Sequence, residues 1–115
     1  GNYFIKKGKK GNIISSGYII NLLPDLLGGK VFSDFNIISL PIVNFKYNKD
    51  INKHLVDGNV YMVTDAFSPI FFYEIKKLIK NKKVKILDLQ LNKVKKTGSE
   101  LDILKQMGLK NSFFN

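Results

Sequence analysis

The second half of the chain alternates between the pattern of a strand and the pattern of a helix, and this order restricts the folds open to it. Residues 59–64 form a short run in which alternate side chains face opposite ways, as in a strand. Residues 84–91 repeat the pattern, with Leu87, Leu89 and Leu91 on one face. Each of these runs is followed by a segment with the spacing and caps of a helix. The order strand–helix–strand–helix is therefore the clearest structural signal in the chain.

The first of these helices is predicted over residues 69–81. Ser68 is a suitable N-cap, and Pro69 suits the first helical position because its missing N–H has no intrahelical partner there. Apolar residues then recur at helical spacing and predict a buried stripe made of Ile70, Phe71, Ile75, Leu78 and Ile79.

The last helix is predicted to begin after Ser99, because Ser99 and Asp102 have the spacing of a capping box. Gly108 is expected to end it. Leu101, Leu104 and Met107 would dock this helix on the core. We expect residues 112–115 to fray, although two neighbouring phenylalanines there need a place to be buried or a partner to contact.

The first half of the chain reads mainly as extended segments joined by turns. Residues 22–29 fit either a helical turn ended by glycine or an apolar loop, and residues 47–58 fit a polar loop with one helical turn at 51–56. The expected strands, with a hairpin turn at 8–11, are 2–7, 12–20, 31–39 and 40–47. The predicted fold is therefore α+β, with a mostly antiparallel sheet in the first half followed by strand–helix–strand–helix.

Length and composition place this fold in one domain spanning residues 1–115. Because the first residue is Gly1, we expect the chain to be a trimmed piece whose natural start, with a leader or another domain, lay upstream. Without cysteine, the chain cannot form disulfides, thiolate metal sites or a cysteine nucleophile. No apolar run approaches the ~20 residues that span a bilayer. The absence of cysteine fits a reduced cytosol and equally a secreted protein without cysteine, and of these we expect a cytoplasmic protein.

The chain has 19 lysines and no arginine against nine carboxylates, which gives a formal net charge of +10. This excess has two explanations. It favours an anionic partner, but the A/T-rich codons of a low-GC bacterial or phage genome would also replace arginine by lysine. Without a guanidinium fork, contact with nucleic acid would show weak sequence preference and a steep dependence on salt.

The lysines gather at residues 6–10, 76–85 and 93–96, and we expect these three clusters to converge on one face. The candidate contact residues for a partner or a phosphate are Lys9, Lys10, Lys76, Lys80, Lys82, Lys83, Lys85, Lys93, Lys95 and Lys96. Exposed tyrosines, with Tyr18 and Tyr73 among the candidates, would add to such a contact surface.

Two sets of residues are candidates for catalysis. His54, the only histidine, lies three residues before Asp57 and is either an oriented general base or a solvated loop residue. Asp25, with Glu74 and Lys76, matches the letters of a restriction-type nuclease pattern, although Glu74 falls in a predicted helix rather than on the strand this pattern requires. We therefore predict no metal and no cofactor, and we favour a non-enzymatic role while keeping a nuclease among the hypotheses.

Residues 44–91 resemble part of a bacterial family of immunity proteins, which neutralise polymorphic toxins. The resemblance lies in Val63-Thr64-Asp65 at the end of a strand, in the helical segment 71–79 and in the strand 84–91. It implies a non-enzymatic protein that covers a partner. Many immunity proteins against nucleases are acidic, whereas this chain is basic, so its partner would be an acidic toxin or a toxin without a nucleic-acid site.

Three functional hypotheses follow. The first is a binding protein that engages or neutralises an acidic protein partner, such as a toxin, through its lysine-rich surface. The alternative is a basic domain that contacts the nucleic-acid backbone with low sequence specificity, and the third is a small nuclease toxin. The sequence leaves the oligomeric state open.

Overall fold

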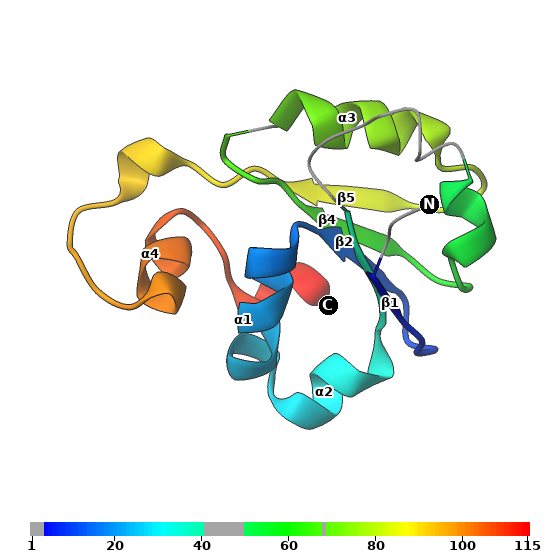
Figure 1. Cartoon of the computed structure of the whole chain (residues 1–115), viewed down its shortest axis with the longest axis horizontal. Coiled ribbons are helices and arrows are strands. Elements are labelled where there is room, and N and C mark those ends of the chain that lie inside the picture. The colour runs from blue at the N-terminus through cyan, green and yellow to red at the C-terminus, as the bar shows by residue number, and fades with distance from the viewer. Residues whose placement is uncertain (1–3, 41–49, 68) are drawn as a thin grey trace.

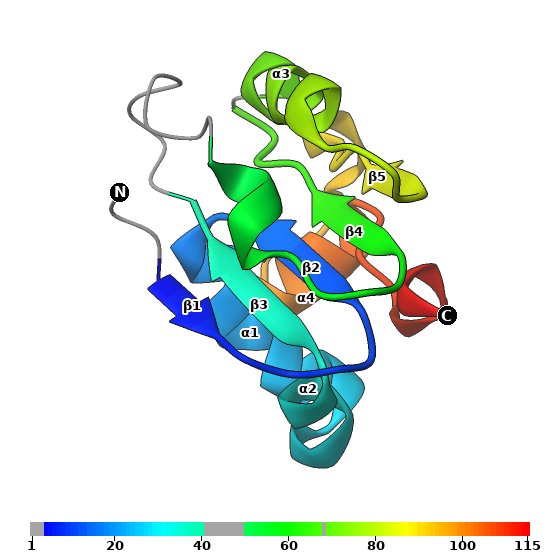
Figure 2. The same cartoon turned by 90° about the vertical axis from the view of Figure 1, so that its right-hand side faces the viewer.

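The computed structural model describes residues 4–40, 50–67 and 69–115, and Figure 1 shows their arrangement. Five short strands form one sheet in the order β1-β3-β2-β4-β5. Their bounds are Phe4–Lys6 (β1), Asn12–Ser15 (β2), Asn36–Ser39 (β3), Val60–Val63 (β4) and Val84–Leu87 (β5). β3, β2, β4 and β5 are parallel neighbours, whereas β1 runs antiparallel to β3 at one edge (Figure 2).

The mostly antiparallel sheet expected from the sequence is therefore wrong, although the chain does combine strands with helices. Residues 17–20 do not continue a strand but begin helix α1 (Gly17–Leu27), and residues 29–34 form helix α2 (Gly29–Asp34) instead of an extended segment. These helices carry the chain back to the edge where β2 began, so β3 runs parallel to β2. The expected hairpin at residues 8–11 is also wrong, because β3 lies between β1 and β2.

Both faces of the sheet are covered, as the two views show (Figures 1 and 2). On one face, Ile13, Ile37 and Tyr61 pack with the buried residues of α1 and with the C-terminal part of the chain. On the other face, Ile14, Ile38 and other core residues pack against helix α3 (Pro69–Leu78) and the short 3₁₀ helix η2 (Ile51–His54). Burial on both faces makes β2 and β3 continuously apolar at their centres, as is typical of parallel strands.

Helix α1 shows why residues 17–27 are helical. Its buried residues Ile19, Leu23 and Leu27 recur every fourth position and so form one stripe facing the sheet. Gly28 then ends the helix at φ 88°, in the left-handed region that favours glycine. The helical alternative for residues 22–29 is thus confirmed, over a longer segment than the sequence indicated.

Helix α3 follows β4 as predicted, and most of its expected stripe is confirmed, because Ile75 is buried and Phe71, Leu78 and Ile79 pack against the core. Phe72 and Ile75 are the buried residues. Ile70, expected in the core, is 76% exposed. The expected N-cap Ser68 and the expected strand residues 41–47 lie outside the described residues.

The C-terminal segment forms helix α4 (Glu100–Gln106), with the 3₁₀ helices η3 (Leu91–Lys93) before it and η4 (Asn111–Phe114) after it. The predicted capping box is confirmed: Ser99 Oγ accepts the Asp102 N–H, and Asp102 Oδ2 accepts the Ser99 N–H. The chain end does not fray, because Phe114 is buried in edge-to-face contacts among aromatic rings. No helix in the described segments is long and apolar enough to cross a membrane.

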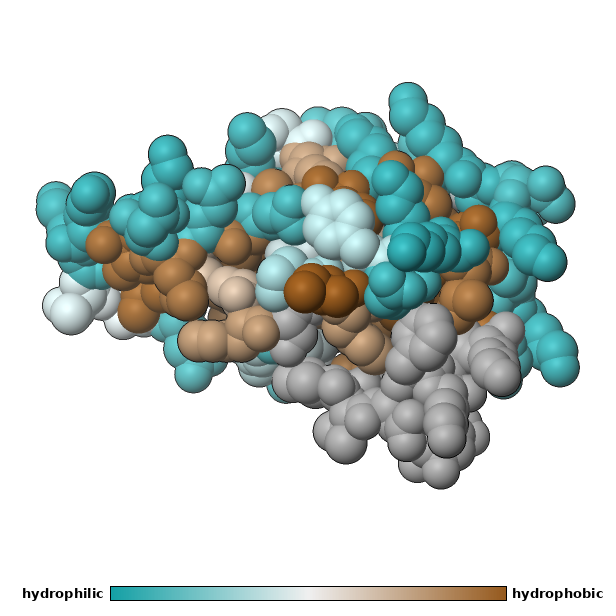
Figure 3. Space-filling view, turned by 90° about the horizontal axis from the view of Figure 1, so that it is seen from above, coloured by the Kyte–Doolittle hydropathy of each residue, from teal (hydrophilic) through white to brown (hydrophobic). Residues whose placement is uncertain are grey.

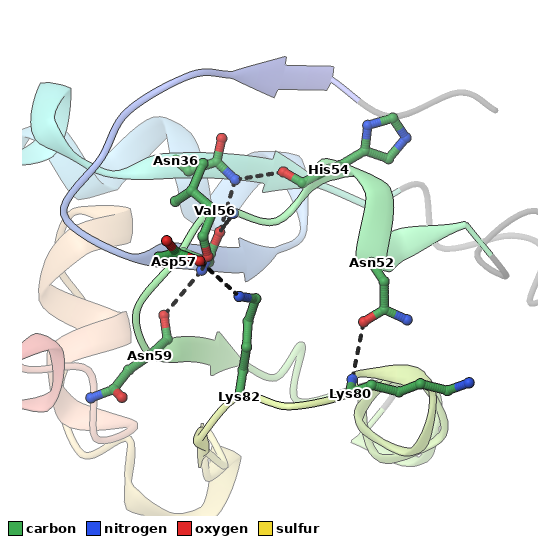
Figure 4. Close-up of polar contacts among 9 residues, drawn as sticks. Asn36, Asn52, His54, Val56, Asp57, Asn59, Lys80 and Lys82 are labelled. Atoms are coloured by element: carbon green, nitrogen blue, oxygen red, sulfur yellow. Dashed lines mark hydrogen bonds and ion pairs between the residues drawn. The ribbon is translucent and has the colours of Figure 1, made fainter.

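A buried asparagine, Asn12, ties together the segments at the amino ends of the strands, and Figure 4 labels its partners Asn36, Val56 and Asn59. Asn12 Nδ2 donates to the carbonyl oxygens of Val56 (2.9 Å) and Asn59 (3.3 Å). Its Oδ1 accepts the Val56 N–H at 2.8 Å and the Asn36 Nδ2–H at 2.9 Å. Asn36 also donates to the carbonyl oxygen of His54. These bonds hold the segment before β4 against β2 and β3.

Replacing Asn12 with Ala should destabilise the fold strongly. The Val56 N–H and the Asn36 amide would lose their acceptor in a buried site, at a cost of about 1–3 kcal/mol for each unsatisfied group. We expect the free energy of unfolding, measured by urea denaturation, to fall by ~3 kcal/mol. The control Asn21→Ala, on the exposed side of α1, should change it by less than ~0.5 kcal/mol. Equal losses in both variants would contradict this role of Asn12.

Candidate functional site

Two of the three lysine clusters meet at the amino edge of the sheet, where β2 and β4 begin. Lys9 and Lys10 lie in the turn before β2, and Lys80, Lys82 and Lys83 lie in the turn before β5. Backbone hydrogen bonds hold both turns to the start of β4. Asn59 O accepts the Asn12 N–H, and Lys83 O accepts the Val60 N–H. The sheet therefore brings together lysines that are far apart in the sequence.

The third cluster lies elsewhere. Lys93, Lys95 and Lys96 follow the carboxyl end of β5, in the arm that extends to the left in Figure 1. There the backbone N–H groups of Lys95 and Lys96 donate to Gln106 Oε1. The expected convergence of all three clusters on one face is therefore not found.

Two further candidate lysines lie away from the amino-edge turns. The Lys85 ammonium lies over the rings of Tyr61 and Phe113, at 5.5 and 5.8 Å from their centroids, so it is engaged in packing. Lys76 is exposed on α3.

The structure does not place His54 against Asp57. His54 Nε2 lies 3.5 Å from Asp50 Oδ2, four residues earlier. Figure 4 shows the imidazole pointing away from Asp57, whose Oδ1 faces the Lys82 ammonium at 3.9 Å. The orientation of His54 by Asp57, which the general-base interpretation requires, is absent.

The fold also separates the two acidic residues of the nuclease pattern. Asp25 lies on α1 and Glu74 on α3, and these helices cover opposite faces of the sheet (Figure 1). The two carboxylates therefore cannot bind one metal ion. In the described part of the chain, no three acidic or histidine side chains are grouped closely enough to hold a metal.

The carboxyl edge of the sheet holds a second group of residues, which the sequence analysis did not bring together. Chain segments that leave β2, β4 and β5 emerge side by side there. Ser15 Oγ donates to Val63 O at 2.8 Å, and the Leu89 N–H donates to Thr64 Oγ1 at 3.2 Å. In the sheet, β2 lies between β3, the next strand in the sequence, and β4. The strand order therefore changes direction at β2, and the chain segments on its two sides diverge at its carboxyl end. Open sheets of this kind characteristically bind ligands at that position.

A buried carboxylate lies at this edge. Asp65, directly after the last hydrogen-bonded residues of β4, is only 3% exposed and accepts the Phe67 N–H on Oδ1 at 2.8 Å. Burial raises the pKa of the Tyr18 phenol, and the Asp65 carboxylate raises this pKa further. The first turn of α1 and the end of β4 are therefore electrostatically coupled.

A cleft of about 270 Å³ opens beside these groups. Its walls are almost wholly apolar, with Glu100 as the acidic residue, and the lining residues are Tyr18, Phe67, Leu91, Glu100, Ile103, Leu104 and Met107. Exposed apolar side chains continue around the cleft and along α3. We call them the carboxyl-edge patch, and its members are Tyr18, Phe67, Ile70, Tyr73 and Leu91.

The patch concentrates exposed apolar surface at one edge of the sheet. Phe67 is 77% exposed and Ile70 76%, whereas Tyr18, Tyr73 and Leu91 are about half exposed. Among the described residues, Val31 is the other large apolar side chain with comparable exposure. Figure 3 shows hydrophobic surface on the α3 side, most extensively at the end where the chain leaves β5. Tyr73 is anchored there by donating to Asp88 Oδ2 at 2.6 Å.

The sequence indicated only part of this patch. Tyr18 and Tyr73 were candidate surface aromatics and are exposed. Ile70 was assigned to the core, and Phe67 was not singled out. One feature of the sequence could have indicated that Phe67 is exposed. It lies in the connection between a predicted strand and a predicted helix, and such connections usually run over the surface.

The coupling between Tyr18 and Asp65 can be tested by titration. Asp65→Asn removes a negative charge that disfavours the phenolate, so the pKa of Tyr18 should fall. It should stay above the ordinary value because burial, the larger cause, remains. The measurement is the NMR signal of the Tyr18 ring carbon, assigned with Tyr18→Phe. The control Asp57→Asn, at the opposite edge, should leave this pKa unchanged. An unchanged pKa in Asp65→Asn would show that the two groups are not coupled.

Comparison with known proteins finds no match: no family model, no curated protein and no solved structure is significantly similar to the chain. The resemblance to immunity proteins therefore stays a prediction.

Proposed function

We propose that this chain is a non-enzymatic domain that binds a protein partner through the carboxyl-edge patch. The observation that carries the proposal is the exposure of Phe67 and Ile70, each about three-quarters accessible to solvent in a fold that buries its other isoleucines where they are described. Ile79, Ile86 and Ile103 are the partly buried exceptions.

Exposed side chains of this size are favourable anchors for association. Full burial of a Phe or Ile side chain contributes roughly 1.5–3 kcal/mol. Aromatic residues clustered next to a pocket are also typical of the energetically dominant centres of protein interfaces. Phe67 lines the cleft, so a partner side chain entering it would contact this ring.

Three lysines beside the patch fit an acidic partner, and they stand alongside the carboxylates of Glu100 at the cleft and Asp88 at Tyr73. Lys93 belongs to the same short helix as Leu91, and Lys95 and Lys96 follow directly. These lysines would form a charged rim, which directs association and selects the partner more than it adds affinity. The lysine-rich contact expected from the sequence is therefore retained at the rim, while the apolar patch forms the centre.

The segment that resembles immunity proteins supports the same surface. This segment, residues 44–91, includes β4, α3 and β5, and therefore Phe67, Ile70 and Tyr73. A neutralising protein acts by covering its target and needs no catalytic residues. Within this proposal, the partner is an acidic protein of the toxin class, encoded beside this chain as immunity proteins and their toxins are.

The test is co-expression with the products of neighbouring genes. We expect the chain to form a complex with one of them and the double variant Phe67→Ser/Ile70→Ser to bind it at least ~30-fold more weakly, since the two anchors together contribute ~2 kcal/mol or more. Affinity is measured by isothermal titration calorimetry of the purified components.

Two controls make this outcome specific. Val31→Ser, an exposed apolar residue on α2, should leave the affinity within about twofold. Thermal unfolding should show that Phe67→Ser/Ile70→Ser is as stable as the parent chain, because both side chains project into solvent. A complex that forms equally well with the double variant, or no complex with any neighbouring product, would refute the proposal.

A further inference from the structure

We infer that the amino edge of the sheet is a second binding surface, separate from the carboxyl-edge patch, and that it contacts the phosphate backbone of nucleic acid. This surface consists of lysines from three separate connections of the chain. We call them the amino-edge lysines: Lys9, Lys10, Lys53, Lys80, Lys82 and Lys83.

The fold holds these connections in fixed positions. The turn before β2 touches the turn before β4, where a Cβ on Gly58 would lie 3.3 Å from the Gly11 Cα. Helix η2, which carries Lys53, is joined to the end of α3 by Asn52, which donates to Leu78 O at 2.7 Å and accepts the Lys80 N–H at 3.0 Å (Figure 4). These contacts fix the relative positions of the backbone segments that carry the lysines.

At this edge, positively charged lysines outnumber the carboxylates. Three carboxylates lie nearby, on Asp34, Asp50 and Asp57, so the amino-edge lysines outnumber them two to one. Asp57 faces Lys82 at 3.9 Å, and Asp50 lies beside His54. Apart from Lys82, whose side chain is 18% exposed, the amino-edge lysines are exposed to solvent. A concentrated positive edge of this kind attracts polyanions.

The chemistry of the edge favours phosphates over base edges. Lysine offers a mobile point charge, whereas reading guanine requires the planar fork of arginine, which this chain lacks. The exposed aromatic rings of the described residues lie at the opposite edge, so bases have no stacking platform here. We therefore expect binding to duplex backbone with little sequence preference and a steep salt dependence.

The experiment uses a fluorescein-labelled duplex of about 20 random base pairs and measures anisotropy at about 50 and 200 mM salt. The triple variant Lys80→Gln/Lys82→Gln/Lys83→Gln should bind at least ~10-fold more weakly at the lower salt, and its plot of log Kd against log salt should lose roughly 2–3 units of slope. Lys9→Gln/Lys10→Gln should weaken binding in the same direction, from an independent connection.

A matched control tests whether binding depends on where the lysines lie or only on the net charge of the chain. Lys93→Gln/Lys95→Gln/Lys96→Gln removes the same charge at the opposite edge and should weaken binding less than about threefold. Equal losses in the two triple variants, or no binding at the lower salt, would overturn the inference. Tighter binding of poly-glutamate than of duplex would also overturn it and assign the edge to an acidic protein. Phe67→Ser/Ile70→Ser should bind duplex normally, so this result is independent of the proposed partner complex.

Discussion

The parallel pairing of β2 with both β3 and β4 is the constraint on which the rest of the structure depends. In the register observed, Asn12 lies opposite Asn36 on one side and Val60 on the other, so these three strands begin at one edge. Asn12 reinforces this register through four hydrogen bonds to neighbouring segments. A connection between two parallel strands must return across a face of the sheet, and such crossings place helices on both faces.

The same constraint separates two kinds of surface. Turns that precede parallel strands meet at the amino edge, and the segments that follow them meet at the carboxyl edge. Lysines are concentrated in the former, and the exposed rings of Tyr18 and Phe67 with the side chain of Ile70 lie in the latter. One surface therefore suits a polyanion and the other an apolar protein partner, and neither excludes the other.

How much could be predicted differs between the two halves of the chain. β4, α3 and α4 were recognised because their periodicity and caps are local, as the Ser99–Asp102 capping box shows. The segment 12–20 was misread because isoleucines before and after Ser15 suit a strand equally well, and only packing of Ile19 against the sheet makes the second group helical. Together with the extended segment predicted at residues 31–34, which belong to α2, this error led to the predicted antiparallel sheet that the structure contradicts. For the candidate site, the lysines were recognised individually, but Ile70 was assigned to the core.

By itself, the sequence determined the local elements of the second half, the excess of lysine and the absence of cysteine chemistry, because these depend on residue type and short spacing. Only the tertiary structure decided which lysines meet, that Asp25 and Glu74 lie on opposite faces, and that Phe67 lines one cleft with Tyr18 and Leu91. The reason is that strand order and direction arise from contacts between residues far apart in the chain, such as Asn12 with Asn36. Spacing along the sequence contains no record of those contacts.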